Sequence, residues 1–73
     1  MSVVWWPDAE EDWKRLSYAD AEAVARAVQR WDEAGEGLVY AAGPTEYRLL
    51  VGRLLVVFYM ERDITHVAQV RRA

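Results

Sequence analysis

Four arginines in the second half of the chain are the side chains best suited to binding phosphate groups. They are Arg48, Arg53, Arg71 and Arg72. Residues 44–73 carry five basic and three acidic side chains, a balance of +2, whereas residues 1–43 carry four basic and nine acidic ones, a balance of −5. A polyanion would therefore be attracted to the second half. We predict phosphate contacts by these arginines; the alternative is that they are solvated side chains on the polar face of a sheet.

His66 is the single histidine, and the chain has no cysteine. A thiolate or histidine-rich metal site therefore has no ligand set, and we expect neither a metal nor a cofactor. His66 could transfer protons near neutral pH. Its position two residues from both Ile64 and Ala68 favours instead a structural place, facing the helices or the sheet edge.

Two amphipathic segments in the first half predict the helices that must support such a site. The first starts at Pro7, which suits the first helical position, and aligns Ala9, Trp13 and Leu16 on one side. The second is predicted over residues 18–34, because residues 17–20 resemble a capping box and Gly35 is a natural helix end. The acidic cluster at residues 8–12 fits a first helical turn, and the four tryptophans fit core positions.

After Gly37 the apolar residues recur with a period of two. Runs rich in β-branched and aromatic residues predict strands at residues 38–41, 47–51, 54–60 and 64–71, and a short β-prone run lies at residues 3–5. Helices at one end of a chain and strands at the other are typical of an α+β fold. We expect two N-terminal helices packed on one face of a four- to five-stranded, mainly antiparallel sheet.

Length and hydropathy indicate a single domain over residues 1–73. No apolar run reaches the roughly 18 residues of a membrane span, and no basic segment precedes a hydrophobic one at the N-terminus. The sequence therefore predicts a cytoplasmic protein with no membrane partner.

Several segments resemble the RelE/ParE family of toxins from type II toxin–antitoxin systems. Residues 46–52 followed by 56–59 are similar to the double strand of that family, residues 67–72 to its last strand, and residues 6–12 to its first helix. The resemblance implies the α+β fold described above. It also implies a toxin that is neutralised by a bound antitoxin.

The resemblance leaves the mode of action open. RelE-like members cut mRNA on the ribosome, whereas ParE-like members inhibit DNA gyrase. Arg48 aligns with the first basic residue of the double strand, but Leu50 and Leu55 stand where many nuclease members carry basic residues. An mRNA endoribonuclease, a gyrase inhibitor and a non-catalytic interaction module on the same scaffold all remain candidates.

Alternation along the strands predicts one further surface. If the core takes Tyr47, Leu49, Val51, Leu54, Val56 and Phe58, the opposite face becomes apolar. Its residues would be Leu50, Leu55, Val57, Tyr59 and Val67. Large exposed apolar patches usually mark a binding site for a partner. We predict that this face binds an antitoxin segment or a second copy of the chain; the alternative is that another part of the chain covers it.

Overall fold

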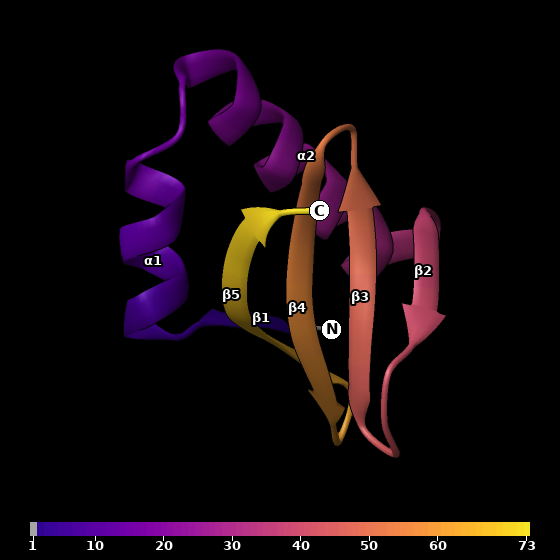
Figure 1. Cartoon of the computed structure of the whole chain (residues 1–73). Coiled ribbons are helices and arrows are strands. Elements are labelled where there is room, and N and C mark those ends of the chain that lie inside the picture. Colours follow the sequence, from indigo (N-terminus) through magenta and orange to yellow (C-terminus); the bar gives the residue numbers. More distant parts are fainter. Residues whose placement is uncertain (1) are drawn as a thin grey trace.

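Two helices cover one face of a single five-stranded sheet (Figure 1). The computed structural model describes residues 2–73. In chain order the elements are β1 (Ser2–Trp5), α1 (Pro7–Lys14), α2 (Tyr18–Ala34), β2 (Leu38–Ala41), β3 (Glu46–Val51), β4 (Leu54–Glu61) and β5 (Ile64–Arg72). The predicted α+β class and the helical cover of the sheet are confirmed. None of the helices between Ser2 and Ala73 is long and apolar enough to cross a membrane.

α1 begins at Pro7 and α2 spans residues 18–34, as the sequence predicts, but α1 ends at Lys14 and leaves Leu16 outside the helix. Pro7 occupies the first turn of α1. The Ser17 hydroxyl accepts a hydrogen bond from the Asp20 backbone N–H at 3.2 Å and so caps α2. Gly35 ends α2 with φ +66°, a left-handed conformation that glycine adopts without strain, and its N–H donates to the Trp31 carbonyl. Local signals therefore set both ends of α2.

The sheet has the order β1-β5-β4-β3-β2. The pairs β2–β3, β3–β4 and β4–β5 are antiparallel, and β1 pairs with β5 in parallel. The first and last strands of the chain are therefore neighbours, so the β-prone run at residues 3–5 becomes an edge strand. At the other edge lies β2, which is four residues long.

The core lies between the helices and the sheet. It is formed by Ala9, Val24 and Val28 from the helices and by Leu49, Leu54, Val56, Phe58, Val67 and Val70 from the strands. Phe58 is 1% exposed, and its ring lies 5.4 Å from that of Trp31 and 5.6 Å from that of Tyr47. Trp5 and Trp13 are half-buried against the same core, as predicted, whereas Trp6 is 41% exposed.

A β-bulge in β5 changes the alternation that the sequence predicts. Val57 is opposite Gln69, but Phe58 is opposite Val67, so Ala68 has no partner in β4. The extra residue turns Val67 toward the helices, where it is fully buried. The prediction that Val67 lies on the opposite face is therefore wrong.

Polar side chains from both helices hold β5 in place. The Asp12 carboxylate accepts a hydrogen bond from the Val70 backbone N–H at 3.1 Å, beyond the point where β1 stops pairing. On the core side, the Thr65 hydroxyl donates to the Asp32 carboxylate at 3.3 Å, and both side chains are buried. Each helix thus contributes one carboxylate oxygen that accepts a hydrogen bond from β5.

Candidate functional site

Three rows of side chains cross the open face, which is the sheet face turned away from α1 and α2. Directly opposed residues of antiparallel strands point to the same side of a sheet. The rows are Glu46–Tyr59–His66, Arg48–Val57–Gln69 and Leu50–Leu55–Arg71. A carboxylate, a phenol, an imidazole and a guanidinium therefore lie in two adjacent rows, which makes this face the candidate site.

Glu46 is the centre of a polar network on the open face. Its Oε2 accepts a hydrogen bond from Arg48 Nη2 at 2.9 Å, and its Oε1 accepts one from the Tyr59 hydroxyl at 3.0 Å. Trp6 stacks on the Tyr59 ring at 5.5 Å between centroids, and its Nε1 lies 3.5 Å from His66 Nδ1. Five side chains from three strands and the β1–α1 connection thus form one continuous cluster.

These contacts shift the ionisation of the cluster. The hydrogen bond from Arg48, and then that from Tyr59, lowers the pKa of Glu46. The hydrogen bond that Tyr59 donates to Glu46 also raises the pKa of the Tyr59 hydroxyl, with burial as a second cause. The separate hydrogen bond from Arg48 to Glu46 raises the pKa of the Arg48 guanidinium. Glu46 is therefore a weak proton acceptor, Tyr59 a weak proton donor, and the charge of Arg48 is balanced within the cluster.

Replacing Arg48 with alanine is expected to raise the pKa of Glu46 toward its usual value, because the carboxylate loses its strongest hydrogen-bond donor. A carbon-13 NMR titration of the Glu46 carboxyl group measures this shift. The folded pKa of Glu46 lies below the unfolded one, so ionised Glu46 stabilises the fold above about pH 4.3. That contribution is lost as the pH falls through the folded pKa. Arg30→Ala, an exposed change on α2, should leave the titration unaltered. Identical Glu46 curves in the wild-type chain and in Arg48→Ala would contradict the expectation.

Solved toxin structures share this architecture over nearly their whole length. No family model and no curated protein sequence matches the chain. A chain of the intact E. coli RelBE toxin–antitoxin complex matches with a TM-score of 0.80 at 14% identity, covering 97% of this chain and 94% of its own length. The Staphylococcus aureus YoeB dimer gives 0.80 at 14%, covering 100% and 97%. The P. aeruginosa ParDE system gives 0.75 at 12%, covering 100% and 96%. This is the RelE/ParE toxin fold.

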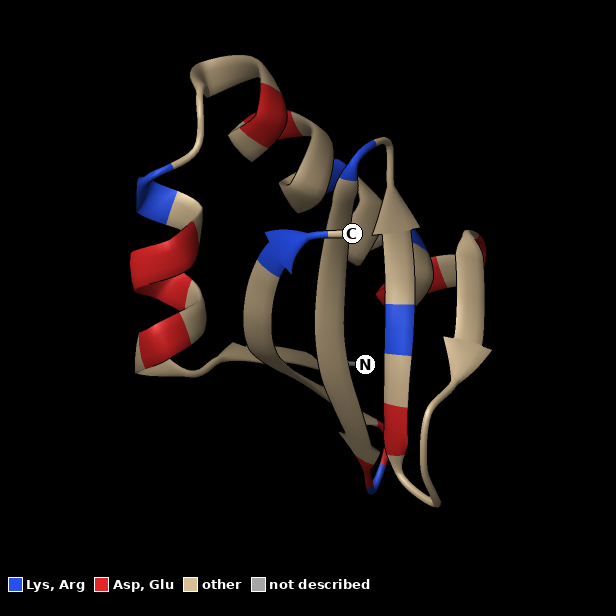
Figure 2. Ribbon diagram, in the orientation of Figure 1, with Lys and Arg blue, Asp and Glu red and all other residues tan. Residues whose placement is uncertain are grey.

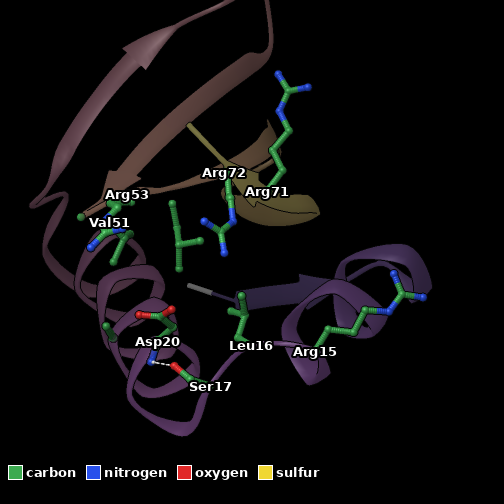
Figure 3. A pocket seen from close by; sticks show the side chains of 11 residues that line it. Arg15, Leu16, Ser17, Asp20, Val51, Arg53, Arg71 and Arg72 are labelled. Atoms are coloured by element: carbon green, nitrogen blue, oxygen red, sulfur yellow. Dashed lines mark hydrogen bonds between the residues drawn. The ribbon is translucent and has the colours of Figure 1, made fainter.

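The four predicted phosphate contacts do not form one strip on this RelE/ParE sheet. Arg48 and Arg71 lie on the open face, but Arg48 is occupied by Glu46. Arg72 is opposite Leu54 on the helix side, and Arg53 lies in the β3–β4 turn. Figure 3 shows Arg72 pointing toward Leu16 rather than toward the open face. A single basic strip is therefore ruled out, and phosphate binding by individual arginines remains a prediction.

The predicted apolar patch on the RelE/ParE open face is much smaller than expected. Leu55 and Val57 do lie on this face but are only 5% and 6% exposed. They belong to the central strand, so side chains of β3 and β5 flank them on both sides. Leu50 and Tyr59 are half-buried. The most exposed apolar side chains of the sheet lie instead on its two edge strands: Leu38 (71%) and Tyr40 (48%) on β2, and Val4 (43%) on β1.

Three members of the cluster were missed from the sequence as site residues: Glu46, His66 and Trp6. Period-two alternation from Arg48 would have placed Glu46 on the same face, and the short turn at Gly52 sets its pairing with Tyr59. The prediction that His66 faces the helices or the sheet edge is wrong in part, because it lies in a row of the open face, beside β1. Its Nε2 atom is buried and makes no hydrogen bond.

Metal binding has no support in the part of the chain that the structure describes. Residues 2–73 contain no group of three or more histidine, aspartate or glutamate side chains arranged to hold a metal ion.

Proposed function

We propose that this chain is the toxin component of a type II toxin–antitoxin pair. The observation that carries the proposal is the near-complete mutual coverage with the RelE, YoeB and ParE chains. The resemblance of residues 46–59 to the double strand of these toxins supports it independently. An antitoxin is the expected partner, since the RelE and ParE relatives were solved as parts of toxin–antitoxin systems.

The geometry favours a toxin that acts by binding its target, such as DNA gyrase or the ribosome, without cutting RNA. Cleavage needs several placed cations and a proton-transfer partner near the phosphate. On the open face Arg48 is neutralised by Glu46, and Arg71 is the only other arginine in the three rows. The pKa of Glu46 is lowered, which makes it a poor general base.

Ribosome-dependent RNA cleavage is the second candidate. One observation favours it: Glu46, Arg48, Tyr59 and His66 supply a carboxylate, a guanidinium, a phenol and an imidazole on one face. A bound phosphate would have to replace Glu46 as the partner of Arg48, which would restore the carboxylate as a proton acceptor. Arg71 would then add a second cation.

A non-catalytic interaction module is the candidate from another class. The exposed Leu38 and Tyr40 on β2, next to half-buried Leu50, form an apolar edge of the open face. An exposed apolar edge of this kind is suited to contact with another protein, which could be a second copy of the chain. On this alternative the protein associates but does not arrest growth.

Controlled expression in a bacterial host is expected to arrest growth while cellular mRNA stays intact. Mapping of mRNA ends and a gyrase supercoiling assay on the purified chain distinguish the targets. mRNA cuts that disappear in both Glu46→Gln and Arg48→Ala, but persist in Arg30→Ala, would establish the cleavage candidate instead. Normal growth at a confirmed level of folded protein would remove the toxin proposal and leave the interaction module.

A further inference from the structure

A groove at one end of the molecule lies apart from the open-face cluster. It is formed by the α1–α2 corner, the β3–β4 turn and the end of β5, with a cavity of about 660 Å³ between them (Figure 3). We call it the corner groove. Its floor is apolar: Leu16 and Val51 are half-buried and Leu54 is 7% exposed. The groove therefore offers a surface on which apolar side chains of a ligand could be buried.

The rim of the corner groove is strongly basic. It contains Arg15, Arg53, Arg71 and Arg72, which are four of the nine basic residues of the chain, and Asp20 is its only acid. The residues that line the groove therefore carry a net charge of +3, in a chain whose net charge is −3. The end of β5 and the β3–β4 turn stand out as basic in Figure 2, whereas α1 is largely acidic. The groove thus has the opposite sign to the molecule as a whole.

The rim arginines have no internal partner that would neutralise them. The ion pairs within residues 2–73 are Arg26–Glu22 and Arg48–Glu46, and none involves the groove. Arg72 points across the groove toward Leu16, Arg53 lies beside Val51, and Arg15 and Arg71 extend outward from the two sides (Figure 3). Arg53 and Arg72 are therefore the rim cations that a ligand on the apolar floor would meet, while Arg15 and Arg71, whose guanidinium groups point away, add positive charge at the outer edge.

We propose that the corner groove binds an acidic segment of a partner protein, with apolar side chains on the floor and carboxylates at the rim. Arginine clusters recognise acidic motifs through charge-assisted hydrogen bonds. A nucleic acid fits less well, because no aromatic ring lines the groove to stack a base and the floor would face a charged backbone. The identity of the partner rests on the proposed function: if the chain is a toxin, the partner is its antitoxin. The binding of an acidic segment by the groove does not rest on it.

Binding of short fluorescein-labelled peptides to the full chain tests the groove, with fluorescence anisotropy as the readout. The probes are a glutamate–leucine peptide, its lysine–leucine counterpart, its glutamate–serine counterpart and an oligouridylate. The glutamate–leucine peptide is expected to bind most tightly, and more weakly as salt is added, since salt screens exposed charges. Arg53→Glu/Arg72→Glu should weaken it about tenfold and should improve binding of the lysine peptide.

The matched control is Arg30→Glu/Arg62→Glu, which changes the net charge equally at exposed positions outside the groove and should leave the affinity unchanged. Amide NMR shifts in the wild-type chain provide a second measurement that needs no variant; they should concentrate around Leu16, Ala23 and Gly52. Equal losses in both double variants, tighter binding of the oligouridylate, shifts elsewhere or no peptide binding would each overturn the proposal. Growth arrest together with any of these results would leave the toxin proposal standing and remove only the groove.

Discussion

Replacement of Phe58 by alanine is expected to lower the free energy of unfolding by about 3–5 kcal/mol. Phe58 is 1% exposed in the central strand, and its ring contacts those of Trp31 from α2 and Tyr47 from β3. The substitution would therefore open a cavity where the helix layer meets the sheet. Folded domains gain only about 0.05–0.15 kcal/mol per residue, or roughly 4–11 kcal/mol for this length. A large part of the total stability should disappear.

Urea unfolding followed by circular dichroism and tryptophan fluorescence measures this loss. Tyr18→Ala is the control, because it also removes an aromatic ring but at a position that is 84% exposed. Its effect should stay within about 0.5 kcal/mol. A cost for Phe58→Ala no greater than that for Tyr18→Ala would show that the ring does not pack as described.

Thr65→Val is expected to lower the free energy of unfolding by about 1.5–3 kcal/mol, the range for a hydrogen bond to a charged group. Thr65 is 1% exposed, and its hydroxyl donates to the Asp32 carboxylate, which belongs to a residue that is 8% exposed. Valine keeps the shape of threonine but removes the donor. The carboxylate would then remain buried without this hydrogen bond, which is costly. Chemical denaturation again provides the measurement.

A double-mutant cycle with Asp32→Leu separates the hydrogen bond from side-chain packing. Once Asp32 is leucine, the change of Thr65 to valine should cost little, because no buried carboxylate is left unpaired. Thr65→Ser keeps the hydroxyl and serves as the conservative control. Strict additivity of the two single changes would argue that the residues do not interact.

Local signals in the sequence are sufficient for most of this fold. Ser17 and Gly35 mark the ends of α2, since each acts on its own helix terminus. The two-residue turn at Gly52 and Arg53 fixes Val51 opposite Leu54, and the register of the whole β3–β4 hairpin follows, including Glu46 opposite Tyr59. Features that depend only on near neighbours in the chain were therefore predictable.

Two features that the sequence does not reveal decide the candidate site. The bulge at Ala68 reverses the facing of residues on either side of it, so Val67 is in the core while Gln69 lies on the open face. The parallel pairing of β1 with β5 brings Trp6 to His66 across sixty positions of sequence. Neither depends on local propensity: the bulge is an irregularity in how two strands pair, and the parallel pairing joins segments that are far apart in the sequence.

The pairing of β1 with β5 also affects the order in which parts of the sheet fold. Residues 2–5 pair with residues 64–67, so Val3 and Trp5 have no sheet neighbour until β5 reaches them from the far side of the intervening chain. Contacts between distant parts of a sequence slow folding, because the intervening loop must close first. Residues 2–5 and 64–67 should therefore gain protection from amide hydrogen exchange in the same late step.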